Sequence, residues 1–368
     1  MIKELNLKNF KCFENLHIEM SRLNIFAGIN SMGKSTAIQA LLLLRQAYEM
    51  NSLEKGIYLN GVLTNIGRGY DLLYRNSESE KIIIELKTDY IEFCNEYIYA
   101  KESDFQKIEF TTLNWKDFKK KNLFGDNFSY VSAERSGPQK YYNSSYHEIY
   151  DQNQVGTKGE YFAGYLAERG NVDKVTNSKI LHPSACSEML IYQMEAWMSE
   201  LSPGIHLNPK KYQEAGIVSL EYSISTEPYT PINVGFGLSY VAPIVLSLLK
   251  AKEGDLVIIE NPEAHLHPRG QRKMGEMISY AAAGGVQVIV ETHSDHLLNG
   301  VRLAVKTKKL SRNDIKLNYF YDTVNADVKY GEVIKHEKCS PMIMDDGSLT
   351  DWPEGFFDEW DKALEELF

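Results

Sequence analysis

The hydrophobic pattern of the first fifty residues predicts three strands and a helix, in that order. Apolar and polar residues alternate over 2–10 and 13–20, which is typical of strands with one buried face. Residues 23–27, Leu-Asn-Ile-Phe-Ala, indicate a buried strand. From Ser35 onward, apolar residues recur at helical spacing, at Ala37, Ile38, Ala40, Leu41, Leu44 and Ala47. We therefore expect a hairpin that leads into a central strand, a glycine turn and a helix.

The pattern changes twice more along the chain. Between about 54 and 230 the sequence is polar, and we interpret this stretch as an inserted subdomain that contains a strand over 82–86 and a helix over 186–201. After Pro231, strands over 256–259 and 286–290 alternate with helices that end at Leu249 and begin at Arg269. Helices that alternate with buried strands predict an α/β core.

The tail from residue 316 has a mixed pattern. Strands are expected over 317–321 and 331–336, followed by an acidic loop and a short helix from about Gly355. In this helix four large apolar residues share one face, namely Phe357, Trp360, Leu364 and Phe368.

A phosphate-binding loop joins the third predicted strand to the first helix. Residues 28–35 read Gly-Ile-Asn-Ser-Met-Gly-Lys-Ser and match G-x-x-x-x-G-K-[ST] in full. Lys34 is expected to reach the β- and γ-phosphates of ATP, and the Ser35 hydroxyl is expected to bind Mg²⁺. The residues expected to contact ATP are Asn30, Ser31, Met32, Gly33, Lys34, Ser35 and Thr36. Nearby Lys11 and Phe13 are more simply explained as a solvated lysine and a core phenylalanine than as a base pocket.

A second motif places carboxylates at the end of a buried strand. Residues 255–263 read Asp-Leu-Val-Ile-Ile-Glu-Asn-Pro-Glu, which is a Walker B arrangement. Glu260 is the expected Mg²⁺ ligand together with Ser35, directly or through water. An acid one or three residues later could orient the attacking water, and here those positions are Asn261 and Glu263.

Two further stretches are candidates for the same site. Residues 233–239, Asn-Val-Gly-Phe-Gly-Leu-Ser, precede an apolar helix and form a second potential anion cradle, in which Gly235, Gly237 and Ser239 are the candidate contacts. His293 follows the strand 286–290 and is expected at the same sheet edge as Glu260, as a catalytic candidate.

The order of these motifs resembles that of ABC-type ATPases, and in particular their RecF/OLD-like branch. Residues 7–13 resemble the start of that branch, N-F-[KR]-x-F, and residues 260–268, Glu-Asn-Pro-Glu-Ala-His-Leu-His-Pro, resemble its Walker B and D-loop box. Residues 352–358, Trp-Pro-Glu-Gly-Phe-Phe-Asp, resemble the C-terminal box of one bacterial subfamily. Residues 130–138 also look like a subfamily segment, without an assigned role.

The resemblance implies an α/β fold, an ABC-type P-loop NTPase head with a mixed sheet, an antiparallel β subdomain and an inserted α/β arm subdomain. The expected segments are 1–53 for the N-terminal part of the head, 54–230 for the inserted β and helical subdomain, 231–315 for the C-terminal part of the head, and 316–368 for the terminal strands and helix. Two protomers would then sandwich two ATP molecules head to tail, with Gly235, Gly237 and Ser239 acting in trans.

The resemblance also implies a biological role. The leading hypothesis is an ATP-hydrolysing homodimeric switch, the ATPase component of a bacterial anti-phage defence system that acts with a separate effector such as a nuclease. The alternative is a RecF-like DNA-repair ATPase, in which the lysine clusters at 116–121 and 306–309 contact DNA, although such clusters are more often solvated faces. A transporter subunit is disfavoured by Asn261 and by the insert.

Two departures from the family pattern matter. Most ABC ATPases have a catalytic glutamate where this chain has Asn261, which cannot accept a proton. Either Glu263 takes over that role, or hydrolysis is slow and the ATP-bound dimer is long-lived. The residues after His293 are too few for the metal-binding TOPRIM domain of OLD nucleases, and Asp345-Asp346 is more simply a solvated turn. We therefore expect no intrinsic nuclease activity.

The amino-acid composition argues against several classes of protein. The 368 residues carry a formal net charge of −10, which argues against a protein that coats nucleic acid. The four cysteines lie far apart, which suggests neither a zinc site nor a disulfide framework. The apolar stretches are too short to span a bilayer. A cytoplasmic protein with no membrane partner is expected.

Overall fold

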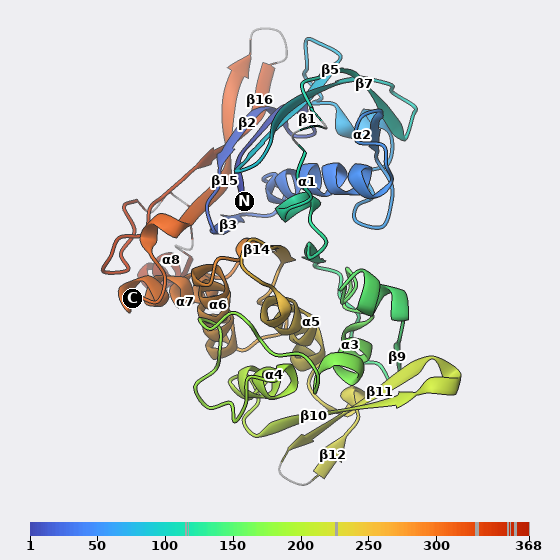
Figure 1. The fold of residues 1–368 in the computed structure, drawn as a ribbon. Coiled ribbons are helices and arrows are strands. Elements are labelled where there is room, and N and C mark those ends of the chain that lie inside the picture. The colour runs from blue at the N-terminus through green and yellow to red at the C-terminus, as the bar shows by residue number, and fades with distance from the viewer. Residues whose placement is uncertain are drawn as a thin grey trace. The chain divides into compact units, whose positions relative to one another are not determined.

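The chain forms two compact units, which we describe separately (Figure 1). The computed structural model describes residues 1–114, 116, 118–224, 227–327, 331–351, 353, 355–356 and 359–367. Unit 1 contains residues 1–125, 315–342 and 349–368, and unit 2 contains residues 126–314 and 343–348. The stretch 54–230, expected as one insert, is therefore divided between the two units after Gly125.

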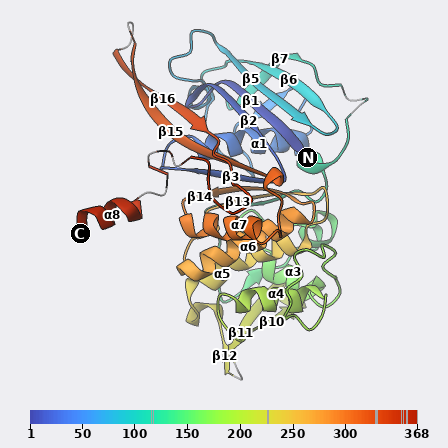
Figure 2. The same ribbon diagram turned by 90° about the vertical axis from the view of Figure 1, so that its left-hand side faces the viewer.

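Unit 1 contains an antiparallel sheet. Its strand order is β2 (Phe13–Glu19), β1 (Ile2–Phe10), β5 (Lys81–Thr88), β6 (Glu92–Ile98), β7 (Phe105–Thr111) and β4 (Gly56–Tyr58). The predicted hairpin is present, with Phe10 opposite Phe13. Helix α1 (Lys34–Glu49) lies along one side of this sheet (Figure 2), and the apolar residues at helical spacing are buried.

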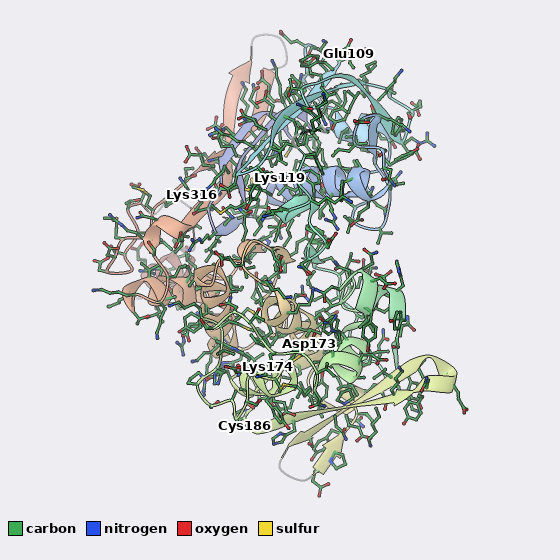
Figure 3. The ribbon with its side chains drawn as sticks, in the orientation of Figure 1. Glu109, Lys119, Asp173, Lys174, Cys186 and Lys316 are labelled. Atoms are coloured by element: carbon green, nitrogen blue, oxygen red, sulfur yellow. The ribbon has the colours of Figure 1, made fainter. Side chains whose placement is uncertain are left out.

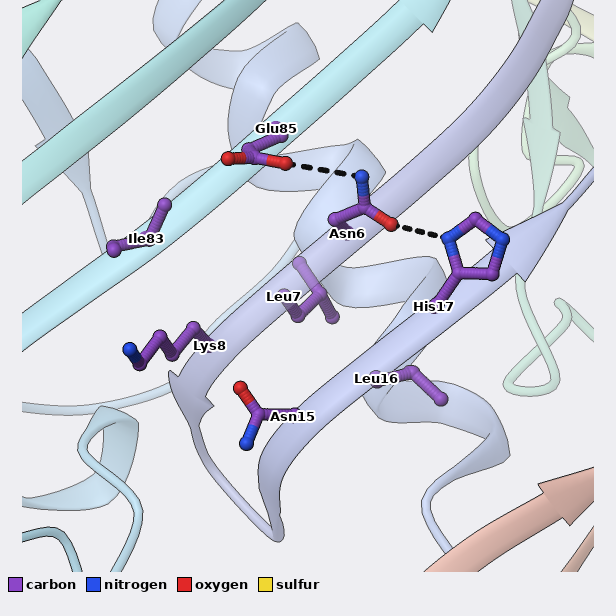
Figure 4. A pocket seen from close by; sticks show the side chains of 8 residues that line it. All are labelled: Asn6, Leu7, Lys8, Asn15, Leu16, His17, Ile83 and Glu85. Carbon is purple, nitrogen blue, oxygen red and sulfur yellow. Dashed lines mark hydrogen bonds between the residues drawn. The ribbon is translucent and has the colours of Figure 1, made fainter.

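Polar residues fix the register of three neighbouring strands of this sheet (Figure 4). Asn6 on β1 donates a hydrogen bond to Glu85 of β5, with Nδ2 to Oε2 at 3.0 Å, and its Oδ1 lies 2.5 Å from Nδ1 of His17 on β2. The surface pocket around them has a volume of about 420 Å³. Because these polar groups bond one another across the strands, they stabilise the observed pairing.

Unit 1 also contains the strand that leads into the phosphate loop. Strand β3 (Leu23–Gly28) pairs in parallel with β15 (Ile315–Asp327), and β15 pairs antiparallel with β16 (Gly331–Cys339). Both C-terminal strands are longer than expected. Short helix α2 (Gly69–Leu72) and the terminal helix α8 (Glu359–Leu367) complete the unit.

The terminal helix begins later than the sequence pattern indicates. Gly355 has φ of +77°, a conformation that glycine tolerates and a continuing right-handed helix excludes. Within the C-terminal box, Trp352, Glu354, Phe357 and Asp358 lie outside the described residues. The same holds for Phe368 and for the side chain of Trp360.

The core of unit 2 is a parallel sheet flanked by helices. Strand β13 (Leu256–Glu260) pairs in parallel with β8 (Ser129–Val131) on one side and with β14 (Gln287–Thr292) on the other. Helices α5 (Phe236–Lys250), α6 (Pro268–Ala283) and α7 (Asp295–Lys306) belong to the same unit. The residues that precede Glu260 in β13 are fully buried, as the sequence predicts for a central strand.

The arm of unit 2 is itself α/β. It contains β9 (Tyr142–Asn143), β10 (Ile205–Tyr212), β11 (Ile217–Ile224) and β12 (Glu227–Tyr229), with helices α3 (Phe162–Arg169) and α4 (Leu190–Ser199). Helix α4 begins later than expected because the residues before it are extended. Val175 N donates to Glu188 O at 2.9 Å, and Lys174 pairs with Met189.

None of the helices within the described ranges has the length and apolar character needed to cross a membrane. Where an antiparallel β subdomain, an α/β arm and parallel strands were expected, the structure has all three, and the α/β fold class is confirmed.

Candidate functional site

The glycine loop at residues 28–35 leaves β3 and turns directly into α1. Gly28 and Gly33 have φ of 141° and 94°. A Cβ at Gly28 would lie 2.3 Å from the carbonyl oxygen of Phe320, and one at Gly33 would lie 2.4 Å from Cζ of Phe13. Only glycine fits these two positions, and the backbone curls tightly, as a phosphate cradle requires.

Lys34 is held inside this loop. Its side chain is buried, and Nζ donates to the carbonyl oxygens of Gly28 at 3.0 Å and Ile29 at 2.7 Å. The ammonium group has three N–H donors, and a bound phosphate would accept hydrogen bonds from the same group. Because Lys34 is also the first residue of α1, the positive end of the helix dipole adds to the attraction for an anion.

The other loop residues differ in exposure. Asn30, Ser31 and Ser35 are exposed, whereas Thr36 is buried with its Oγ1 3.6 Å from Sγ of Cys12. Thr36 thus offers a ligand mainly its backbone, while the Ser35 hydroxyl lies on the surface where Mg²⁺ is expected.

The two residues of the possible base pocket have other roles. Phe13 is 1% exposed and packs on Phe320, with ring centroids 6.1 Å apart, so it is a core residue as interpreted. Lys11 is not a solvated lysine. Its Nζ donates to Oε1 of Gln39 at 2.7 Å, and burial lowers the pKa of its ammonium group.

In unit 2, Glu260 ends β13 and is largely buried. Its Oε2 accepts a hydrogen bond from Ala133 N at 3.1 Å, and the Tyr130 hydroxyl also bonds this carboxylate. Burial raises the pKa of Glu260, and these two donors and the Arg135 guanidinium oppose the rise. A carboxylate that is costly to bury gains from a cation, which fits a Mg²⁺ ligand.

Asn261, Glu263 and His293 lie at the same edge of unit 2. Glu263 accepts hydrogen bonds from Thr292 Oγ1 at 2.8 Å and from His293 N at 2.7 Å, one at each carboxylate oxygen. Burial raises the pKa of Glu263. Asn261 has φ of 46°, and its buried Oδ1 has no hydrogen-bond partner among the residues described. Glu263 therefore ties the ends of β13 and β14 together and positions the exposed His293.

The glycine-rich turn before α5 is exposed, whereas the serine that follows it is not. No atom lies within 4 Å of a Cβ built at Gly235, and Phe236 is 59% exposed. Ser239 is 1% exposed inside its own unit. The Ser239 side chain is therefore not exposed to a second chain in this structure, and its expected contact with the partner's nucleotide stays a prediction. The exposed part of the motif is the turn of residues 235–237.

This turn lies against the D-loop box. A Cβ at Gly237 would be 2.6 Å from the carbonyl oxygen of His265, and the ring of Tyr240 lies 4.5 Å from the His265 ring. Both segments border a cleft of about 490 Å³, whose lining includes Asn233, Gly235, Gly237, His265, Leu266 and His267. Two motifs that are about thirty residues apart in sequence thus share one surface.

Sequence reasoning assigned no role to residues 130–138, which the structure places beside Glu260. Arg135 is 4% exposed and donates to the backbone oxygens of Glu260 and Asn261, at 2.7 Å each. The available signal was a charged Glu-Arg pair two residues after a short strand, which is an unusual place for a buried arginine.

The two lysine clusters and the turn at Asp345-Asp346 lie on the surface. Lys119, which is labelled in Figure 3, and Lys121 lie over the Tyr90 ring at 5.6 and 5.1 Å, and the cluster at 306–309 is exposed. The side chain of Asp345 is 80% exposed, and Asp346 accepts from Ser348 N at 2.8 Å, which makes this a solvated turn. No group of three potential metal ligands occurs in the part of the chain that the structure covers.

Three protein-family models match the chain. Residues 1–178 match an AAA ATPase domain, and residues 188–299 match a model described as "AAA domain, putative AbiEii toxin, Type IV TA system". Residues 310–367 match a protein family of unknown function, DUF3696. None of the curated proteins matches the chain.

Solved structures of SMC head domains are similar to the chain. The SMC head domain from Thermotoga maritima is 14% identical, covers 92% of this chain and 98% of its own, and has a TM-score of 0.44. An SmcHead bound to the C-winged helix domain of ScpA is 13% identical, with coverages of 92% and 98% and a TM-score of 0.48. The Smc head domain bound to the C-terminal domain of ScpA derived from Pyrococcus furiosus is 14% identical, with coverages of 100% and 99% and a TM-score of 0.49.

The family matches and the loop geometry agree with each other. A full phosphate loop lies within the first AAA match, and the Walker B strand and the glycine turn lie within the second. The matches are to AAA-type ATPase domains in general and do not single out the RecF/OLD-like branch. The chain has the fold of a P-loop ATPase of the AAA kind, a class that binds nucleotide, usually with Mg²⁺.

Proposed function

We propose that the protein is an ATP-driven switch that works as a head-to-tail homodimer, with each ATP shared between two chains. The observation that carries this proposal is the shared surface of the glycine turn at 235–237 and the D-loop box. Gly235 is open to solvent, and the Phe236 side chain beside it is mostly exposed. An exposed anion cradle with an adjacent apolar side chain suits contact with the nucleotide of a second chain.

The proposed chemistry divides among four groups. Lys34 binds the β- and γ-phosphates, and Ser35 and Glu260 complete the Mg²⁺ shell. The backbone N–H groups at the start of α5 bind the γ-phosphate of the partner's ATP. Mg²⁺ would neutralise phosphate charge and polarise the γ-phosphoryl group. Asn261 supplies no base at the usual position. Either Glu263 acts as the base, or each round of hydrolysis is slow and the closed dimer is long-lived.

The proposed biological role is the ATPase component of an anti-phage defence system with a separate effector. The match of residues 188–299 supports this role, because the description of that model names an AbiEii toxin and a type IV toxin–antitoxin system. The RecF-like repair alternative has no corresponding support among the matched models. The exposed lysine clusters by themselves are compatible with ordinary solvated surface.

A complementation experiment tests whether each ATP site is shared. Lys34→Ala removes the phosphate-binding ammonium group of its own chain. Gly235→Glu puts a negative charge at the turn, where nothing lies within 4 Å of an added Cβ. Each variant alone is expected to lose ATP turnover. In a 1:1 mixture, heterodimers keep one intact site of two, so about a quarter of wild-type turnover should return. Turnover that stays at the level of the separate variants would show that no site is shared.

A further inference from the structure

The segment that follows β8 bridges two parts of unit 2. Strand β8 runs parallel to β13, with Tyr130 opposite Ile258 and Val131 opposite Ile259. The chain therefore leaves β8 beside Glu260, where Ala133 N donates to the Glu260 carboxylate. The next residues turn toward α5, and a Cβ at Gly137 would lie 3.6 Å from the ring of Tyr240.

Arg135 is the residue in this segment that contacts both sides. One terminal nitrogen of its guanidinium donates to Ser132 O at 2.8 Å and Glu260 O at 2.7 Å, and the other donates to Asn261 O at 2.7 Å. The planar fork thus holds the two consecutive carbonyls at the end of β13. A lysine has no such rigid pair of donors and cannot reproduce this arrangement.

The same guanidinium packs on the helix that begins at the glycine turn. Its Cζ lies 5.6 Å from the centroid of the Tyr240 ring, in a cation–π contact. Tyr240 in turn contacts His265, five residues beyond Glu260. Burial lowers the pKa of Arg135, and the nearby Glu263, Tyr240 and Glu260 oppose this shift only in part. Its buried Nε has no partner among the described residues. The guanidinium charge of Arg135 is thus buried, at a cost in desolvation free energy, with one of its N–H groups unbonded among these residues. The stability of the fold alone does not favour such an arrangement.

We propose that Arg135 is a positioning residue that locks the carboxyl end of β13 to helix α5, so that the Glu260 carboxylate and the turn at 235–237 move as one body. Mg²⁺ binding at Glu260 would then set the position of the turn that the partner chain's ATP contacts. This inference rests on the proposed function and adds to it the route by which one ATP site affects the next.

A matched control separates this role from the general cost of changing a buried arginine. Arg45 in unit 1 is 5% exposed, and its guanidinium likewise donates to two backbone carbonyls, those of Leu123 and Gly125. These two carbonyls, and Glu49, which forms an ion pair with Arg45, all belong to unit 1. Arg45→Lys therefore reports what the loss of a buried guanidinium fork does to stability alone.

The experiment measures two responses in full-length protein. One is the gain in affinity for a fluorescent ATP analogue when Mg²⁺ is added, which reports Glu260, and the other is ATP-dependent dimerisation, which reports the turn. Arg135→Lys is expected to lower both about tenfold, while affinity without Mg²⁺ stays unchanged. Tyr240→Leu removes the cation–π contact with Arg135 and the ring contact with His265 but leaves the hydrogen bonds of Arg135 to Glu260 O and Asn261 O, so it should keep the Mg²⁺ response and lose dimerisation.

The outcomes distinguish this inference from the proposed function. If the wild type does not dimerise with Mg²⁺-ATP, the proposed function fails and the inference fails with it. If the wild type dimerises and Arg135→Lys behaves like Arg45→Lys in both responses, Arg135 has a structural role alone. The same conclusion follows if Tyr240→Leu keeps full dimerisation, because the contact between Arg135 and α5 would then transmit nothing.

Discussion

Glu260→Gln is expected to lower ATP turnover by about 10²-fold or more, because a Mg²⁺ ligand loses its charge and the metal contributes several kcal/mol to transition-state stabilisation. The shape of the side chain is kept, and Gln can still accept the hydrogen bond from Ala133 N. Nucleotide affinity without Mg²⁺ should stay close to that of the wild type, since Lys34 lies in the other unit. Steady-state phosphate release and equilibrium nucleotide binding measure the two quantities.

Glu134→Gln is the matched control for this prediction. Glu134 is in the same loop as Ala133, its side chain is 82% exposed, and it forms an ion pair with Lys158. Removal of an exposed, solvent-screened charge should change turnover little. Equal losses in the two variants would mean that loop charge, and not metal binding by Glu260, explains the effect.

Asn261→Glu is expected to raise ATP turnover, by about 10²-fold or more if the new carboxylate acts as the general base. The same change should cost about 1 kcal/mol of stability, because φ of 46° suits asparagine better than glutamate. Multiple-turnover kinetics and a thermal melt test both parts. Unchanged turnover in a folded variant would show that position 261 does not face the attacking water.

Glu263→Gln then distinguishes the two roles left open for Glu263. If Glu263 is the base, Glu263→Gln should abolish the turnover of the wild type, and Asn261→Glu should restore it in the double variant. If Glu263 positions His293, the double variant should stay impaired, because an amide cannot accept from both Thr292 Oγ1 and His293 N as the carboxylate does. Normal turnover by Glu263→Gln would exclude both roles.

The sequence predicted the elements whose signal is local. The phosphate loop, the strand that ends at Glu260 and the helices of the core were predicted within a few residues, because glycine spacing and burial period are properties of short windows. Helix α4 was predicted to begin too early. Residues 188–190 pair with residues 173–175, and the sequence pattern of a short window does not contain that pairing.

The features that were missed depend on contacts between distant residues. Ser239 matches a glycine-serine pattern, but whether it faces solvent depends on how the first turn of α5 packs, and its side chain is buried. Arg135 is 125 residues away from Glu260 along the chain, and only the parallel pairing of β8 with β13 brings them together. The cytoplasmic location and the separate effector stay predictions.

The most direct test of the shared-site account is the solution mass of the protein, measured by light scattering with and without Mg²⁺-ATP, for the wild type and Lys34→Ala. The account predicts that Mg²⁺-ATP converts the wild type from monomer to dimer and that Lys34→Ala, whose loop has lost its buried ammonium group, stays monomeric. A wild type whose mass does not respond to Mg²⁺-ATP and stays that of a monomer would contradict it.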